Sequence, residues 1–301
     1  MSGLLRAAWV LFAAHLALIL FSTAAMVTIL AGSTAIDVTS EPAVTIMRLS
    51  FRFAGPTYVV LGAAAALLFL ADRIGTAKAV ALAGTASVLA LGAELAGTSM
   101  GLPFGDYAYS GLLGYRVLGL VPFPIPLSWF YMLMGSLVIV ARLARRDSPP
   151  SPWRWAVGAG LLMVAWDISM DPAMVKTGHW LWGSGAMFRG LPVWLESFFT
   201  ADAFYGMPLS NWLGWFLTAT VIARVMLVIA PPAEVRDRVA TSRFPVALYL
   251  ANGVMPVALC LRNGFWWAAA LGSAAMLVPA VLALRGTGLA RAEGWATLPS
   301  Q

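Results

Sequence analysis

Five long runs without a charged residue constrain this chain more than any other feature of its sequence. They cover Phe53–Ala71, Val117–Ala141, Ala203–Ala223, Phe244–Leu261 and Asn263–Leu284. A helix needs about 20 apolar residues to cross the hydrocarbon core of a bilayer, and each run is near that length. Only 11% of the 301 residues are charged and 60% are hydrophobic, whereas soluble domains carry about 25% charged residues. The chain is therefore predicted to be an integral membrane protein.

The hydropathy pattern predicts an all-α fold, a polytopic membrane helical bundle of about eight transmembrane helices. A single integral membrane domain is expected over residues 1–301. The N-terminal apolar stretch is longer than the roughly 7–15 residues of a signal-peptide core and has no clear cleavage site, so we interpret it as a retained first helix. The expected spans are residues 8–31, 54–71, 77–97, 124–143, 153–171, 207–230, 244–262 and 265–284.

The positive charges predict the orientation of this bundle. Of the 19 Lys and Arg residues, thirteen fall in segments on the N-terminal side of the membrane and six on the other side. Because cytoplasmic loops carry the excess of Lys and Arg, both termini are predicted to be cytoplasmic, in the cytoplasmic membrane of a bacterium or archaeon. These Lys and Arg residues also account for the sequence pI near 9.9. The arginines form no stripe with interleaved aromatic residues, so nucleic acid is not expected as a partner.

Two long links on the non-cytoplasmic face, residues 98–123 and 172–206, are rich in aromatic residues and glycine. Near them lie three acids within apolar surroundings: Glu94, Asp167 and Asp171. Asp167 and Asp171 lie four positions apart and so share one face of a helix. Pro172 disfavours helical geometry at Asp171, which is expected to end that helix at the membrane interface. Acids inside a membrane are costly and usually functional, so this face is the candidate site.

Polar and aromatic side chains surround these acids in the sequence. Tryptophan and tyrosine are ordinary anchors at membrane interfaces, and a single interfacial acid can extend its side chain to water. Many rings beside buried acids would also suit a carbocation, because ring faces attract positive charge without acting as nucleophiles. No metal site is expected, since neither His15 nor His179 has a partner at metal-binding spacing. The candidate binding residues are Tyr107, Tyr109, Trp129, Trp180, Trp182, Tyr205, Asn211 and Trp215.

A set of ordered motifs resembles the carotenoid biosynthesis membrane proteins, a family that includes carotenoid 1′,2′-hydratases and bisanhydrobacterioruberin hydratases. The motifs are AELAGTSMGLPFGDYAY, VPFPIPLSWFYM, WDISMDPAM, GHWLW and FYGMPLSNWLGWF, in that order. They define a motif-bearing core over roughly residues 90–220. Residues 1–80 and 240–301 resemble the family only as apolar spans.

The resemblance implies a hydratase that adds water across the terminal C1=C2 bond of an acyclic carotenoid end group and forms a tertiary alcohol. It implies an acyclic or monocyclic carotenoid as substrate and no cofactor, with membrane lipid and other enzymes of the pathway as further partners. The reaction needs a proton at C2, a tertiary cation at C1 and a positioned water. Asp167, deeper in the apolar region, is expected to donate the proton. Asp171 is expected to orient the water, supported by Glu94 and Asn211.

Two alternatives remain open on the sequence. An intramembrane prenyltransferase also places aspartates four residues apart, but it holds a diphosphate through Mg²⁺ and needs two acid-rich motifs. This chain has one D-x-x-x-D motif. A lipid or proton transporter would use the acids as a proton relay. No inverted repeat is apparent, and the polar residues cluster at one face rather than at the midplane.

Overall fold

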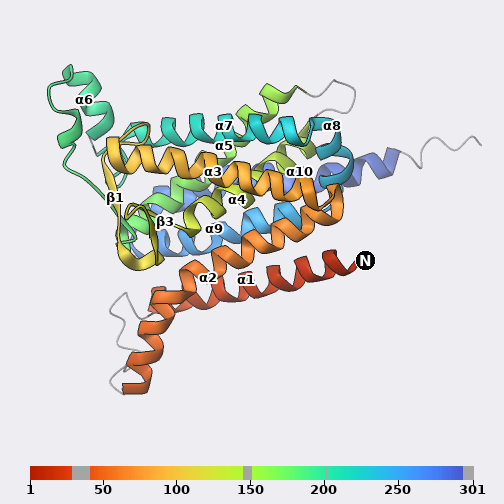
Figure 1. Cartoon of the computed structure of the whole chain (residues 1–301), viewed down its shortest axis with the longest axis horizontal. Helices are drawn as coiled ribbons and strands as arrows, with labels where there is room; N and C mark the ends of the chain where they lie inside the picture. Colours follow the sequence, from red (N-terminus) through yellow and green to blue (C-terminus); the bar gives the residue numbers. More distant parts are fainter. Residues whose placement is uncertain (29–40, 145–150, 201, 294–301) are drawn as a thin grey trace, which may run out of the picture.

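The computed structural model describes residues 1–28, 41–144, 151–200 and 202–293, which form a bundle of long helices (Figure 1). These helices are α1 (Gly3–Thr28), α2 (Glu41–Ile74), α3 (Thr76–Met100), α4 (Pro124–Leu143), α5 (Pro152–Lys176), α7 (Leu209–Ile229), α9 (Phe244–Arg262) and α10 (Trp266–Glu293). The shorter elements are η1 (Gly111–Leu113), η2 (Ala186–Phe188), α6 (Val193–Thr200), α8 (Pro232–Glu234), η3 (Val235–Val239), β1 (Tyr107–Tyr109), β2 (Arg116–Val117), β3 (Val121–Pro122) and β4 (Trp180–Trp182).

The predicted all-α membrane bundle is confirmed. Within the described ranges, seven helices are long and apolar enough to cross a membrane: α1, α2 from Phe53, α3, α4, α7, α9 and α10 to Arg285. The eighth long helix, α5, is less apolar because it carries Asp167 and Asp171. Residues 29–31, the expected end of the first span, lie outside the described residues.

The prediction that α5 ends at Asp171 is wrong, because the helix continues through Pro172 to Lys176. A proline inside a helix removes one backbone N–H donor and crowds the preceding turn, which disfavours the helix without forbidding it. Membrane helices tolerate such interruptions where neighbouring segments hold them. Here α5 contacts α4, α7, α9 and α10, so its last turn is held by the bundle. Asp171 is consequently a helical residue, and it is buried within the bundle.

Helices α4 and α5 form the centre of the molecule. Residues 128–139 of α4 are buried on every side of the helix, and α4 contacts α2, α3, α5, α9 and α10. Close approach of these helices depends on small residues, as is common in membrane proteins. A Cβ atom on Gly135 of α4, for example, would lie 3.0 Å from the carbonyl oxygen of Pro245 on α9. The centre of the bundle is therefore tightly packed, and it holds rigidly the side chains that α4 and α5 present.

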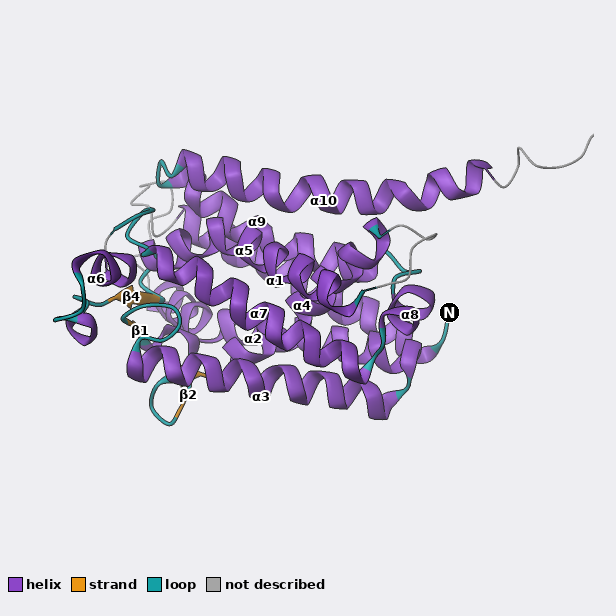
Figure 2. Cartoon of the chain, turned by 90° about the horizontal axis from the view of Figure 1, so that it is seen from above, coloured by secondary structure: helices purple, strands orange, loops and turns teal. Residues whose placement is uncertain are grey.

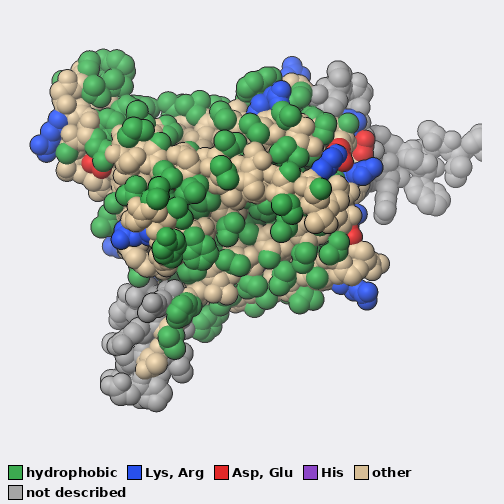
Figure 3. Space-filling model, viewed as in Figure 1, with side chains coloured by type: hydrophobic (Ala, Val, Ile, Leu, Met, Phe, Trp, Pro, Cys, Tyr) green, Lys and Arg blue, Asp and Glu red, His purple; other side chains and the backbone are tan. Residues whose placement is uncertain are grey.

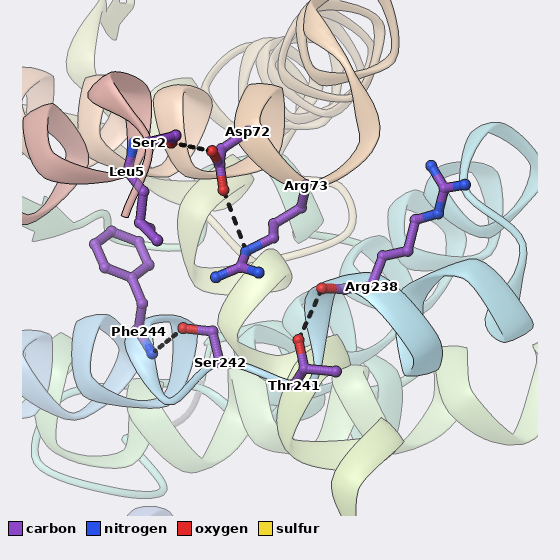
Figure 4. A network of polar contacts seen from close by, with 8 residues as sticks. All are labelled: Ser2, Leu5, Asp72, Arg73, Arg238, Thr241, Ser242 and Phe244. Carbon is purple, nitrogen blue, oxygen red and sulfur yellow. Dashed lines mark hydrogen bonds and ion pairs between the residues drawn. The ribbon is translucent and has the colours of Figure 1, made fainter.

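The N-terminus and the described end of α10 lie at one end of the bundle (Figure 2). Contacts at this end include the Ser2 hydroxyl, which donates to Asp72, and Arg73 Nε, which lies 3.5 Å from the same carboxylate (Figure 4). Lys78 Nζ lies 2.6 Å from Glu234. Charged side chains gather toward both ends, whereas the flank between them is largely hydrophobic (Figure 3). Two of the arginines counted toward this side, Arg145 and Arg146, lie outside the described residues.

The two aromatic links meet at the opposite end of the bundle, beside α6 (Figure 1). There β1 and β4 pair antiparallel, with Tyr107 opposite Trp182 and Tyr109 opposite Trp180. Side chains alternate between the two faces of a strand, so these four rings share one face. Tyr107, Tyr109 and Trp180 are buried, and Leu181 on the other face is 59% exposed. The small sheet therefore directs four aromatic side chains toward the ends of the helices.

Candidate active site

Three buried acids lie on α3 and α5, near the end of the bundle that carries the aromatic links. Glu94 and Asp171 are each 3% exposed, and Asp167 is 0% exposed. A polar group buried in apolar surroundings is costly unless it is hydrogen-bonded. The partners of these acids therefore indicate how each of them is used.

Glu94 accepts three hydrogen bonds from aromatic side chains. Tyr107 Oη and Tyr109 Oη donate to its Oε2 at 2.5 and 2.8 Å, and Trp129 Nε1 donates to its Oε1 at 3.0 Å. Burial, followed by the charge of Glu94, raises the pKa of Tyr107 and of Tyr109 well above its usual range. Both phenols therefore keep their protons and act as donors. Three donors stabilise the charged form of the carboxylate.

Asp171 is held between two indoles from β4. Trp180 Nε1 donates to Oδ1 at 2.6 Å, and Trp182 Nε1 donates to Oδ2 at 3.1 Å. An indole N–H can only donate, so both carboxylate oxygens act as acceptors. The alternation of β4 brings both indoles to Asp171, because the two tryptophans are two residues apart on one face of the strand. This arrangement also favours a charged carboxylate.

Asp167 accepts fewer hydrogen bonds than Glu94 and Asp171, so a negative charge on its carboxylate is less stabilised. Its Oδ2 accepts one hydrogen bond, from Asn211 Nδ2 of α7 at 2.9 Å. Its Oδ1 is buried and, in the described part of the chain, has no hydrogen-bond partner. An unsatisfied buried oxygen in a native protein needs an explanation, and a catalytic role is one of them. Of the three acids, Asp167 is the one whose surroundings best suit a protonated carboxyl group.

A cavity lies beside these acids, and the volume open to the centre of a water-sized sphere is about 80 Å³. A mostly apolar cavity with a few convergent polar groups is typical of a small-molecule binding site. Nine of the residues singled out from the sequence line it. They are Glu94, Asp171, Tyr107, Tyr109, Trp129, Trp180, Trp182, Asn211 and Trp215.

Two residues singled out from the sequence do not line the cavity. Asp167 lies behind the wall, next to Asn211. Tyr205 packs against Phe265 instead, with ring centroids 4.6 Å apart, and so lies away from the acids. His179 is also outside the wall, with Nδ1 2.8 Å from the Thr177 hydroxyl. Its burial lowers its pKa to about 4, so this imidazole is neutral at physiological pH.

A second group of lining residues includes one on α9, a helix that the sequence analysis treated as a plain apolar span. Tyr131, Trp166 and Asn252 belong to this group. Asn252 lies near the middle of α9, so polar side chains are not confined to the face that carries the links. A signal was present in the sequence, because an amide inside an apolar run has to find a partner within the bundle. Among the described residues, no group of three or more His, Cys, Asp or Glu side chains could hold a metal ion.

The fold and the cavity define a polytopic membrane protein with an acid-containing, aromatic cavity. The family described as carotenoid biosynthesis protein matches residues 54–279, which include every helix that contributes an acid. The chain belongs to this family, as its motifs indicated. It is also similar to the bisanhydrobacterioruberin hydratase of Haloarcula japonica, with 28% identity over 152 residues. The match covers 50% of this chain and 44% of the relative, so the chain spans less than half of that protein's length. No solved structure matches the chain significantly.

Proposed function

We propose that this protein is a carotenoid hydratase that adds water across the terminal C1=C2 bond of an acyclic end group. The observation that carries the proposal is the set of three buried acids beside an aromatic cavity in a carotenoid biosynthesis protein. The similarity to a protein named as a hydratase adds support. Carotenoids partition into the bilayer, so a substrate end group would enter the cavity as an apolar chain.

The reaction has a simple balance of atoms and charge. The alkene π electrons form a new C2–H bond with a proton from an acid, which leaves a tertiary cation at C1. A water oxygen then forms a bond to C1, and the resulting oxonium gives one proton back to a carboxylate. Nothing is oxidised or reduced. Site groups must therefore supply a proton, stabilise a cation and accept a proton.

A tryptophan wall suits the cationic step. Trp129 and Trp215 are stacked with ring centroids 4.3 Å apart, and Trp166 meets Trp215 edge-on at 5.8 Å. All three line the cavity. The face of an aromatic ring attracts a cation by up to about 2 kcal/mol in a desolvated site. The wall therefore stabilises a cation at C1 without capturing it covalently.

The acids divide the proton chemistry between them. Asp167, with one hydrogen-bond donor and an unpartnered Oδ1, is the proposed proton donor. Its proton reaches the alkene through one water molecule or a small side-chain movement, since catalytic contacts in ligand-free sites are often incomplete. Asp171, as a carboxylate between its two indoles, stabilises the cation and accepts the released proton, which returns to Asp167 before the next turnover. Glu94 holds the phenols of β1 in place, and Asn211 orients Asp167.

The test is expression of the chain in a host that makes an acyclic carotenoid. The expected product is heavier by one water and keeps its chromophore, because C1=C2 lies outside the conjugated system. A shifted absorption maximum without added water would contradict hydration. Added isoprene units that depend on Mg²⁺ would identify a prenyltransferase instead.

The roles of the two aspartates are tested by isosteric amides. Asp167→Asn removes the transferable proton and should lower turnover by about 10⁴-fold, the upper end of general-acid effects. Asp171→Asn should leave a slower but measurable enzyme, and protein level and carotenoid binding serve as controls for folding. The opposite ranking would exchange the two roles. Wild-type rates in both variants would make the pair structural.

A further inference from the structure

A second buried polar cluster borders the same cavity. It consists of Tyr131 on α4, Asn252 on α9 and His15 on α1. Tyr131 and Asn252 line the cavity and are 1% and 6% exposed. His15 does not line the cavity and is 0% exposed. Since each helical residue adds about 1.5 Å, Asn252 lies about 15 Å from the end of α9 and Asp171 about 8 Å from the end of α5. Asn252 is thus farther from the end of its helix than Asp171 is.

The hydrogen bonds fix the orientation of every group in this cluster. His15 Nδ1 lies 2.6 Å from the carbonyl oxygen of Tyr58, so Nδ1 carries the proton. Nε2 of the neutral ring is then an acceptor, 3.2 Å from Asn252 Nδ2. Asn252 Nδ2 also donates to the Leu248 carbonyl at 2.8 Å. With both amide hydrogens used, the oxygen of Asn252 accepts from Tyr131 Oη at 3.1 Å.

This orientation leaves only acceptor positions facing the cavity. The hydroxyl hydrogen of Tyr131 is used on Asn252, so Tyr131 Oη and Asn252 Oδ1 present lone pairs. Such a pair binds an O–H donor, either water or an alcohol. It offers no proton to an alkene. This second cluster is therefore chemically complementary to the acids, which supply the proton.

The tryptophan wall connects the two polar clusters. At one end, Trp129 Nε1 donates to Glu94, and at the other, Trp166 Nε1 donates to the backbone carbonyl of Asn252 at 3.0 Å. Trp215 contacts both rings. An end group that lies along this wall has Glu94 toward one end and the acceptor pair toward the other.

We propose that Tyr131 and Asn252 hold the water molecule that attacks C1, with His15 as the residue that positions Asn252. This inference rests on the proposed hydration. It places the water beside Tyr131 and Asn252, whereas the sequence analysis expected Asp171 to orient the water. The oxygen of the held water forms the C1–O bond. The proton of the resulting oxonium goes to Asp171, which lines the same cavity.

The test measures how the cation is partitioned in D₂O. In the wild type, the alcohol should carry deuterium at C2. In Tyr131→Phe, the ring stays and the water site is lost, so the cation should lose a proton from C2 or from a methyl group on C1. The result is an unhydrated alkene that carries deuterium at C2. The ratio of alcohol to deuterated alkene should fall about tenfold, as expected for one hydrogen bond. Asn252→Leu should shift the ratio in the same direction.

Tyr249→Phe is the matched control. This tyrosine of α9 is fully buried and donates to the Leu162 carbonyl at 2.7 Å, but it does not line the cavity. Its removal should leave the ratio unchanged. An equal fall of alcohol and deuterated alkene in Tyr131→Phe would show a purely structural role and overturn the inference, as would an unchanged ratio. A wild-type protein that gives neither product would refute the proposed function itself.

Discussion

Gly97 offers the sharpest test of how the site is built. It lies three residues beyond Glu94 on α3, under the phenol of Tyr107. A Cβ atom at this position would lie 2.7 Å from Tyr107 Oη and 2.7 Å from Phe104 Cδ2. Real Cβ contacts are almost never shorter than 3.0 Å. The absence of a side chain at Gly97 therefore allows Tyr107 to reach Glu94 Oε2 at 2.5 Å.

The magnitude of the Gly97→Ala effect follows from these distances. Ordinary contact at about 3.5–4 Å requires Tyr107 Oη to move by about 1 Å, which stretches its bond to Glu94 beyond hydrogen-bond length. Loss of a hydrogen bond to a charged group costs about 1.5–3 kcal/mol, and overpacking costs about 1–3 kcal/mol. The higher helix propensity of alanine returns about 1 kcal/mol. The free energy of unfolding should fall by about 2–5 kcal/mol, together with turnover.

The assay compares unfolding in detergent and carotenoid turnover for Gly97→Ala and Gly92→Ala. Gly92 lies on the same helix, and its Cβ would meet no atom within 4 Å. Gly92→Ala should be neutral or stabilising by up to about 1 kcal/mol. In a Tyr107→Phe background the cost of Gly97→Ala should shrink, because the closest oxygen is gone. If Gly97→Ala behaves like Gly92→Ala, the argument that Tyr107 must reach Glu94 is refuted.

Three further predictions concern the rest of the molecule. Trp180→Phe should lower turnover more than Trp182→Phe, because the hydrogen bond from Trp180 to Asp171 is 2.6 Å long and the one from Trp182 is 3.1 Å long. A hydrogen bond to a charged group is worth about 1.5–3 kcal/mol. Equal turnover rates in the two variants would contradict this ranking. The pKa of His179 is about 4 in the folded protein against 6.5 ordinarily. The unfolded state therefore binds a proton first, and stability should be lost as the pH falls from 6.5 toward 4. The melting temperature should depend less on pH in His179→Gln than in the wild type. An unchanged pH dependence would contradict the assignment of this effect to His179. Reporter fusions after residues 150 and 240 should be cytoplasmic, since Lys and Arg concentrate on the cytoplasmic side. Reporters inserted at Gly105 and Gly185 should lie on the opposite side of the membrane. An external reporter at residue 150 or 240 would contradict the predicted number of transmembrane helices.

The long helices could be predicted from the sequence because each apolar run must hydrogen-bond its own backbone inside a bilayer. The end of α5 could not be predicted from the sequence, because Pro172 disfavours helical geometry at Asp171. The helix continues past this residue because α5 packs against four other helices. Local sequence preferences are outweighed by packing in such cases.

The acids and most of their aromatic neighbours were also predictable, but their pairing was not. Tyr107 and Trp182 are brought together by strands of three residues each, which are far apart in the sequence. The motifs YAY and WLW alternate with the period of a strand, yet that alternation does not reveal the partner strand. Asn252 was visible as an amide in an apolar run and should have been singled out. Tyr205 was singled out for its neighbours in the sequence, whereas its ring packs against Phe265.

The choice of hydrogen-bond donors around the acids has a chemical consequence. Among the described residues, ion pairs involve Asp72, Glu234 and Asp237 but none of the three buried acids. The donors to Glu94 and Asp171 are neutral phenols and indoles, and no Lys or Arg lines the cavity in the described part of the chain. A basic residue there would satisfy the carboxylates equally well, but its charge would repel a carbocation within a few ångströms at low dielectric. Neutral donors satisfy the same oxygens without adding a positive charge to the cavity. This arrangement suits the proposed protonation of an unactivated alkene, which passes through a cation.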